Sequence, residues 1–209
     1  QIWWIMIDII YEDKYIIIVN KKDKFLTIAN DKDKFNNLYY LVSEYVKKKN
    51  KKNKIFIVHR LDYDTSGLVL FAKNEKIKAY FQDHWTDVKR KYIALVSGYV
   101  KKDHDILKHY LKETKTLLTY VAKSGKIALT EYQVLERKDN KTKLEINLLT
   151  GRKHQIRVQL KAIGNPIIGD SKYGGIKNKH MLLHAYYLEF FHPITKEIIK
   201  VESLLPKYF

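Results

Sequence analysis

Residues 59–74, HRLDYDTSGLVLFAKN, contain the feature from which the rest of the chain can be interpreted. Asp62 follows an arginine closely and stands in a loop that ends in Thr-Ser-Gly, and an apolar run over residues 68–72 comes next. A carboxylate at such a junction is either a turn residue that hydrogen-bonds the local backbone or a nucleophile. The local sequence alone leaves both interpretations open.

Apolar patterns on both sides of this loop predict strands mixed with helices. β-branched runs and alternating apolar residues predict strands, and i, i+3, i+4 spacing predicts helices. Strands are expected at residues 2–11, 15–19, 55–58, 68–72, within 91–137, and at 144–148, 182–191 and 197–201, and helices at 36–49 and 77–85. We therefore expect an α+β fold with a mixed, largely antiparallel β-sheet core and flanking helices, in a single domain over residues 1–209.

A third helix is predicted between Thr150 and Gly164. Thr150 is a favourable N-cap, and Gly164 stands where a C′ glycine belongs. His154, Arg157 and Lys161 form a basic stripe on this helix, apart from its apolar stripe. Helical spacing by itself therefore predicts that Arg157 lies on the surface.

The charge of the chain favours a polyanionic partner. Forty Lys and Arg residues against 23 Asp and Glu residues give a formal net charge of +17, and binding to phosphates releases counterions. The 16 tyrosines and eight phenylalanines could stack on unpaired bases. A lysine-rich, merely solvated surface is the alternative, so composition favours nucleic acid without identifying it.

Other compositional features exclude several classes of site. The chain has no cysteine, so it has neither disulfides nor thiolate metal sites, and this suits a reducing cytoplasm. Its eight histidines are scattered, so we expect no metal. The apolar opening segment is shorter than the roughly 20 residues of a membrane span, and Asp8 interrupts it. We therefore expect no membrane association.

Familiar catalytic patterns are missing. Ser66 lacks the Gly-x-Ser-x-Gly surroundings of a nucleophile elbow, and no second carboxylate stands in a setting as distinctive as that of Asp62, as a glycosidase would require. There is no P-loop or dinucleotide-binding glycine pattern. The residues by themselves indicate a basic protein without metal or cofactor and with one well-placed aspartate.

Residues 59–74 resemble the signature of the RluA-type family of RNA pseudouridine synthases, in which the Asp of His-Arg-Leu-Asp is catalytic. Other segments resemble further motifs of this family in the same order: residues 9–21 (IIYEDKYIIIVNK), 89–98 (KRKYIALVSG), 150–174 (TGRKHQIRVQLKAIGNPIIGDSKYG) and the Leu-His-Ala at 183–185. Many relatives also have an S4-type RNA-binding domain before the synthase domain. This chain starts at the first motif, so we expect no such domain within it.

The first motif departs from the family pattern. Family members continue it with Lys-Pro-x-Gly and a Val-His-Pro-like end, whereas this chain has Lys-Lys-Asp-Lys-Phe at residues 21–25 and ends in Ala29-Asn30. The missing proline and glycine leave the shape of this loop open, but they do not affect the implied chemistry.

The resemblance implies that the chain converts uridine in RNA to pseudouridine. It identifies Asp62 as the nucleophile, acting either at the ribose C1′ or by assisting glycal formation. It identifies Arg157 as the arginine that pairs with the catalytic aspartate, against the surface position that spacing predicts. It identifies Tyr92 as the active-site tyrosine that stacks on the uracil and takes part in proton transfer at C5.

Three further residues are candidates for contact with RNA. By resemblance, Arg60 fills the space that the flipped base leaves. Lys91 and His154 either contact phosphate or shape the pocket, or have purely structural roles. Target selection is expected from the hairpin region 101–126 and the basic loop 47–54. The expected partner is rRNA or tRNA, bound by a cytoplasmic monomer. A non-catalytic RNA-binding or ribosome-assembly protein on the same fold is the alternative, and a base-releasing glycosylase is a weaker one.

Overall fold

The structure is a computed structural model that describes residues 7–30 and 33–209. Within these residues three α-helices and eleven strands occur, which confirms the predicted α+β class. Two compact units are present. The first comprises residues 1–88 and 186–204, and the second comprises 89–185 and 205–209. The start of the predicted strand over 2–11 lies outside the described residues, and its end forms β1 (Asp8–Glu12).

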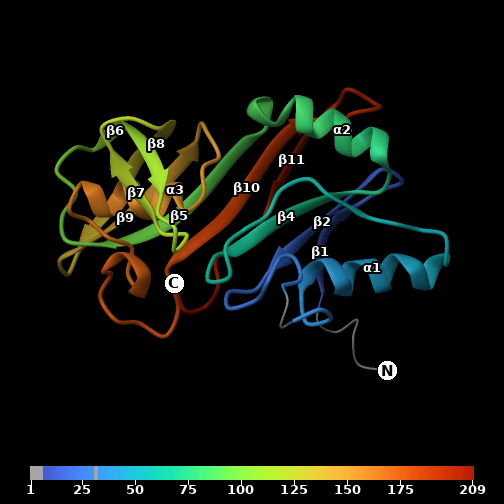
Figure 1. The fold of residues 1–209 in the computed structure, drawn as a ribbon, viewed down its shortest axis with the longest axis horizontal. Coiled ribbons are helices and arrows are strands. Elements are labelled where there is room, and N and C mark those ends of the chain that lie inside the picture. The colour runs from blue at the N-terminus through green and yellow to red at the C-terminus, as the bar shows by residue number, and fades with distance from the viewer. Residues whose placement is uncertain (1–6, 31–32) are drawn as a thin grey trace. The chain divides into compact units, whose positions relative to one another are not determined.

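The sheet of the first unit is built around a strand that is buried on both faces (Figure 1). In β2 (Ile16–Lys21) the first four side chains are fully buried, as its continuous apolar run predicts. β2 pairs antiparallel with β1 and with β4 (Ser66–Ala72). The short β3 (Phe56–Ile57) pairs with β4, and β10 (Leu183–Phe191) pairs antiparallel with β11 (Ile198–Glu202).

Two capped helices cover opposite faces of this sheet. In α1 (Leu38–Lys49), Tyr39 packs against Phe71, whereas α2 (Glu75–Asp83) packs on the face that carries Leu70. Successive residues of a strand point to opposite faces, so the helices lie on different sides. The side chains of Asn37 and Asn74 accept N-cap hydrogen bonds at the two helix starts. α2 ends before the predicted boundary, and the 3-10 helix η2 (Trp85–Asp87) follows it.

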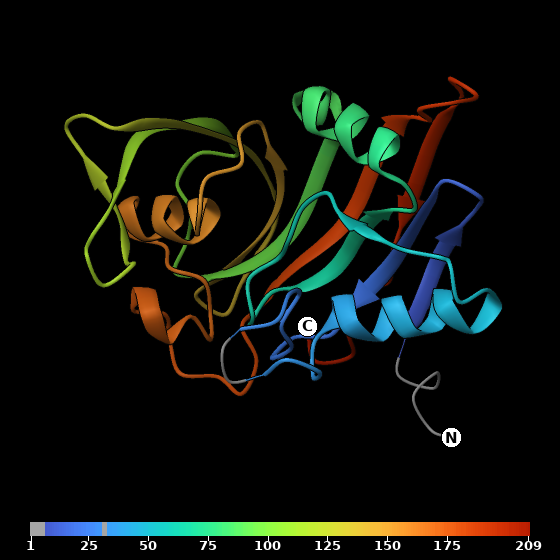
Figure 2. The same ribbon diagram turned by 45° about the vertical axis from the view of Figure 1, so that its right-hand side comes forward.

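The second unit is a curved antiparallel sheet around one helix (Figure 2). Its strand order is β5-β9-β8-β6-β7. The strands are β5 (Lys89–Ser97), β6 (His104–Glu113), β7 (Thr119–Ala122), β8 (Lys126–Lys138) and β9 (Lys141–Leu148). The sequence Lys123-Ser124-Gly125-Lys126 predicts a hairpin turn, and this prediction is wrong. The strands that it joins, β7 and β8, each pair with β6 and not with each other.

The helix of the second unit, α3 (Gln155–Ala162), is joined to the sheet by buried side-chain amides. Gln159 accepts a hydrogen bond from the Thr130 hydroxyl at 2.6 Å and donates to the carbonyl oxygen of Leu107 at 3.0 Å. Gln155 donates to Thr130 at 2.8 Å. Buried amides are costly unless they are hydrogen-bonded, so these bonds fix how α3 sits on the strands.

The predicted N-terminus of this helix is wrong. His154 adopts a left-handed backbone conformation (φ 52°, ψ 21°) directly before Gln155, so the helix cannot extend back toward Thr150. Thr150 is not an N-cap, and its hydroxyl donates to the Gln155 side chain at 2.7 Å instead. The predicted C-terminus is confirmed, because Ile163 is the C-cap and Gly164 follows in the left-handed region.

A charged side chain lies inside the first unit. Lys21, at the end of β2, is 1% exposed. Its Nζ donates to the main-chain carbonyl oxygens of Lys22 (3.0 Å), Phe25 (2.7 Å) and Tyr63 (3.2 Å). Burial lowers the pKa of Lys21 to about 7, although the carboxylates of Asp23, Asp62 and Asp64 oppose this shift.

We predict that replacing Lys21 changes how stability depends on pH. The pKa of Lys21 is about 7 in the folded protein and ~10.4 in an unfolded chain. Between these values the unfolded chain binds the proton more tightly, so Lys21 makes the unfolding free energy rise with pH. In urea denaturation from pH 6 to 10, the wild-type curve should gain up to about 4 kcal/mol relative to Lys21→Met.

The exposed neighbour Lys22 supplies the control. Lys22→Met should leave the pH profile of the unfolding free energy parallel to that of the wild type. If Lys21→Met also gives a parallel profile, Lys21 does not titrate in the folded protein within this range.

Candidate active site

Hydrogen bonds fix the backbone of the Asp62 loop at Leu61, the residue before the aspartate. Leu61 is buried, and its N–H donates to the Thr27 hydroxyl at 3.2 Å. The same hydroxyl donates to the carbonyl oxygen of Leu61 at 2.8 Å. Thr27 is itself buried, so water does not compete for these bonds. These bonds therefore hold the backbone on the N-terminal side of Asp62 in a fixed position.

Hydrogen bonds also fix the loop at Tyr63, the residue after the aspartate. The carbonyl oxygen of Tyr63 accepts from the Lys21 ammonium and from the Phe25 N–H at 3.1 Å. The Thr65 N–H donates to the carbonyl oxygen of Asp62 at 3.2 Å and closes the turn. The Asp62 side chain remains partly exposed between these anchors. Its position suits a group that must reach a bound substrate.

The residues that hold the Asp62 loop come from the end of β2 and from the loop after it. The missing Pro and Gly had left the shape of this loop open. It packs against the start of α1, where Leu38 donates to the Leu26 carbonyl (2.9 Å) and Tyr39 to that of Thr27 (3.0 Å). Sequence reasoning missed both Lys21 and Thr27 as residues that support Asp62. The only signal for Lys21 was its place shortly after a continuous apolar run, and nothing local indicated Thr27.

His59 and Arg60 begin the same loop and differ in exposure. The His59 Nε2 accepts a hydrogen bond from the Leu70 N–H at 3.0 Å, and its ring lies 4.6 Å from that of Trp85. His59 therefore attaches the loop to β4 and to η2. Arg60 is exposed, which is compatible with the predicted RNA contact.

In the second unit, Tyr92 and Lys91 lie on opposite faces of β5. Tyr92 is 9% exposed and stands opposite Ile146, which in turn stands opposite Tyr132. Two residues along β8 from Tyr132, on the same face, Thr130 contacts α3. Tyr92 therefore lies on the face that α3 covers. Lys91 points to the other face, where it forms an ion pair with Glu145 at 2.8 Å.

Arg157 is buried, so the surface position predicted from helical spacing is wrong. Its side chain is held by Asp170, with Nε donating to Oδ2 and Nη2 to Oδ1, both at 2.8 Å. The segment after Gly164 folds back along α3 and brings Asp170 against Arg157, whereas Lys161 on the same stripe stays exposed. A two-point ion pair of this kind fixes the plane of the guanidinium.

A tyrosine joins Arg157 to His154. The Arg157 guanidinium lies over the Tyr173 ring, 5.1 Å from its centre, and the Tyr173 hydroxyl lies 2.7 Å from the His154 Nδ1. Asp170 also accepts from the Tyr173 N–H at 3.3 Å. These four side chains form one arrangement at the start of α3.

The backbone beside Asp170 requires glycine. Gly169 has φ +83°, and a Cβ at this position would lie 2.0 Å from the carbonyl oxygen of His180. The chain therefore passes close to residue 180 and turns Asp170 toward Arg157. The Gly169-Asp170 pair in the motif at residues 150–174 therefore has a structural explanation.

The predicted site residues are divided between the two units. Asp62 and Arg60 belong to the first unit, and Lys91, Tyr92, His154 and Arg157 belong to the second. The structure brings His154 and Arg157 together and separates Lys91 from Tyr92 by the sheet. The pairing of Asp62 with Arg157 stays a prediction.

The described residues contain neither a candidate metal site nor a candidate membrane-spanning helix. Among residues 7–30 and 33–209, no group of three or more His, Asp or Glu side chains could hold a metal ion. Nor does any described helix have the length and apolar character needed to cross a membrane.

Comparison with known proteins agrees with the motifs. Residues 15–162 match the family model described as RNA pseudouridylate synthase. The chain is 35% identical to "Uncharacterized RNA pseudouridine synthase YlyB" of Bacillus subtilis, covering 96% of this chain and 70% of that protein. It is also 35% identical to "Ribosomal large subunit pseudouridine synthase D" of Nitrosomonas europaea, covering 97% of this chain and 63% of that protein.

Solved structures show the same fold. Human RNA Pseudouridylate Synthase Domain Containing 1 aligns with a TM-score of 0.75 at 26% identity, over 96% of this chain and 84% of that one. Human RNA Pseudouridylate Synthase Domain Containing 4 aligns with a TM-score of 0.82 at 20% identity, over 97% and 90%. The family match spans well over half of the sequence and includes Asp62, Tyr92 and Arg157. This chain belongs to the RNA pseudouridine synthase family.

Proposed function

We propose that Asp62 is the nucleophile with which this RNA pseudouridine synthase isomerises uridine. The observation that carries this proposal is the Asp62 loop itself. A partly exposed carboxylate stands between two neighbours whose backbone is anchored by hydrogen bonds to the buried side chains of Lys21 and Thr27. Such preorganisation holds a reacting group in place without a cost at the moment of reaction.

The reaction requires the uridine to leave the RNA stack, which costs a few kcal/mol. The bond between N1 and C1′ breaks, with Asp62 either attacking C1′ or assisting glycal formation. The uracil turns, C5 bonds to C1′, and the C5 proton leaves while N1 gains one. We propose that Tyr92 stacks on the uracil and takes part in this proton transfer. No atom is gained or lost overall.

A nucleophilic carboxylate must remain ionised when the substrate excludes water. An opposite charge within a few ångströms favours the ionised form. We propose that Arg157 supplies this charge. Support comes from its fixed orientation, because Asp170 binds both Nε and Nη2 and so sets the plane of the guanidinium. His154 and the exposed Arg60 are proposed to contact the RNA, as is Lys91.

We propose rRNA or tRNA as the substrate, acted on by a monomer in the cytoplasm. Several relatives are named for the ribosomal large subunit, which favours rRNA. The absence of cysteine suits a reducing compartment.

We predict that Asp62→Asn abolishes turnover but not RNA binding. The substitution keeps the size of the side chain and removes the charge, so pseudouridine formation should fall by at least about a thousandfold. Tritium release from RNA that contains 5-tritiated uridine measures turnover, and electrophoretic mobility measures binding. Chromatography for free uracil separates isomerisation from glycosylase activity.

Asp64→Asn is the matched control, since it removes a carboxylate from the same loop. This variant should retain most of the activity. Turnover by a clean Asp62→Asn preparation at the rate of the Asp64→Asn control would contradict the nucleophile assignment.

A second prediction separates the catalytic role of Arg157 from its structural one. Arg157→Met should lose activity and also lower the unfolding free energy by about 3–5 kcal/mol, because Asp170 is left buried without its partner. The double variant Arg157→Met/Asp170→Asn has no unpaired charge. It should recover much of this stability in urea denaturation and still fail to release tritium. If the double variant regains both stability and activity, Arg157 acts only in folding.

A further inference from the structure

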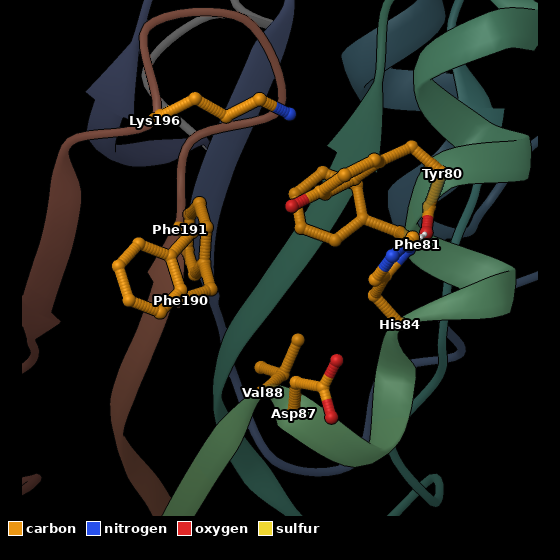
Figure 3. A pocket seen from close by; sticks show the side chains of 8 residues that line it. All are labelled: Tyr80, Phe81, His84, Asp87, Val88, Phe190, Phe191 and Lys196. Carbon is orange, nitrogen blue, oxygen red and sulfur yellow. Dashed lines mark hydrogen bonds between the residues drawn. The ribbon is translucent and has the colours of Figure 1, made fainter.

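A small hollow lies in the first unit, between the end of α2 and the end of β10 (Figure 3). Its volume is about 180 Å³. This is well below the roughly 300–1,000 Å³ of sites for drug-sized ligands, so it suits one small ring system. Its walls are Tyr80, Phe81, His84, Asp87, Val88, Phe190, Phe191 and Lys196.

Flat aromatic surfaces form its two sides. The Tyr80 and His84 rings stack with their centres 4.4 Å apart and their planes at 19°. Phe191 stands on the other side (Figure 3) and is 56% exposed. Phe81, Val88 and Phe190 are buried and belong to the core beneath. The aromatic surfaces therefore rest on a firm base but remain open to a ligand.

Opposite charges stand at the two ends. The Lys196 Nζ lies 4.8 Å from the centre of the Tyr80 ring, and the Asp87 carboxylate is at the other end of the hollow (Figure 3). Both residues are exposed. Among the described residues, Asp87 forms no ion pair, so its carboxylate can accept hydrogen bonds from a ligand.

The hollow is connected to the Asp62 loop within the same unit. η2 carries Asp87 and also Trp85, whose ring lies 4.6 Å from that of His59. The hollow and the start of the Asp62 loop are therefore linked through η2.

We propose that the hollow binds an unpaired guanine of the RNA substrate, outside the site of reaction. This inference rests on the proposed function for the presence of RNA. Aromatic side chains stack on unpaired bases, and each such contact contributes about 1–3 kcal/mol. A carboxylate accepts two hydrogen bonds side by side, and among the RNA bases guanine offers two adjacent N–H donors, at N1 and N2. Lys196 would then meet a flanking phosphate.

The first test uses mononucleotides and does not depend on catalysis. Guanosine, adenosine, cytidine and uridine 5′-monophosphates are titrated into the full chain, and the NMR signals of the Tyr80 and His84 rings are followed. Guanosine monophosphate should bind at least about fivefold more tightly than the other three. Equal binding of all four, or no shift of these rings, would overturn the assignment of guanine.

Asp87→Asn tests which group selects the base. Asp83→Asn is its control, because Asp83 is an exposed carboxylate at the end of α2, shortly before η2, but does not line the hollow. Asp87→Asn should abolish the preference for guanine, while Asp83→Asn keeps it. Lys196→Gln should weaken the binding of all four nucleotides, and Lys76→Gln, on the exposed side of α2, should not. A preserved guanine preference in Asp87→Asn would contradict the role of this carboxylate.

The second test uses the RNA substrate and separates this proposal from the proposed function. Asp87→Asn should raise KM about tenfold and leave kcat unchanged, because the hollow binds but does not react. Asp62→Asn should bind guanosine monophosphate like the wild type. A wild-type chain that forms pseudouridine but shows no preference among the four mononucleotides would refute the guanine site alone. Guanine binding by a wild-type chain that forms no pseudouridine would refute the proposed reaction alone.

Discussion

The buried ammonium of Lys21 determines the arrangement of the Asp62 loop. It gathers the carbonyl oxygens of Phe25 and Tyr63, which belong to two loops that are far apart in sequence. Buried carbonyl groups need donors, and an ammonium can serve several at once. The same charge stands beside the acidic residues of the loop and is itself attracted by them. One side chain thus fixes both the backbone around Asp62 and the local field.

A second buried cation plays a comparable part in the other unit. Arg157 joins α3 to the segment that carries Asp170 and Tyr173. Arginine suits this position because its planar group can bind a carboxylate at two points while it stacks on a ring. In both units, therefore, a cation removed from water orders loops that the sheet alone would leave unsupported. The cost of burying each charge is offset only because several acceptors surround it.

Sequence patterns predicted the elements whose causes are local. The unbroken apolar run in β2 indicated burial on both faces, and the alternation in β9 and the cap at Gly164 were also informative. The errors concern partners that are distant in the chain. Helical spacing placed Arg157 on the surface because nothing near it shows that Asp170 returns to it. Thr150 has the composition of an N-cap, but the left-handed His154 starts the helix later.

The candidate site shows the same limit. Family motifs indicated Asp62, but they did not indicate Lys21 and Thr27, which hold its loop. The roles of these two residues follow from the position of the loop after β2 against the Asp62 loop. A threonine hydroxyl that both donates and accepts with a residue 34 positions away leaves no trace in local sequence. The same holds for the opposite faces of Lys91 and Tyr92, which follow from strand register and not from residue type.

The positive charge of the chain consequently serves two separate purposes. Lys21 and Arg157 are buried and neutralised by the protein itself, and Lys91 is engaged by Glu145. These cations add little to long-range attraction, because nearby acids cancel their field. Attraction of RNA must come from the exposed lysines, such as those of the loop at residues 47–54, and it should weaken as salt rises. RNA affinity and the order of the Asp62 loop therefore depend on different lysines. Substitutions of exposed lysines could change RNA affinity without disturbing the Asp62 loop.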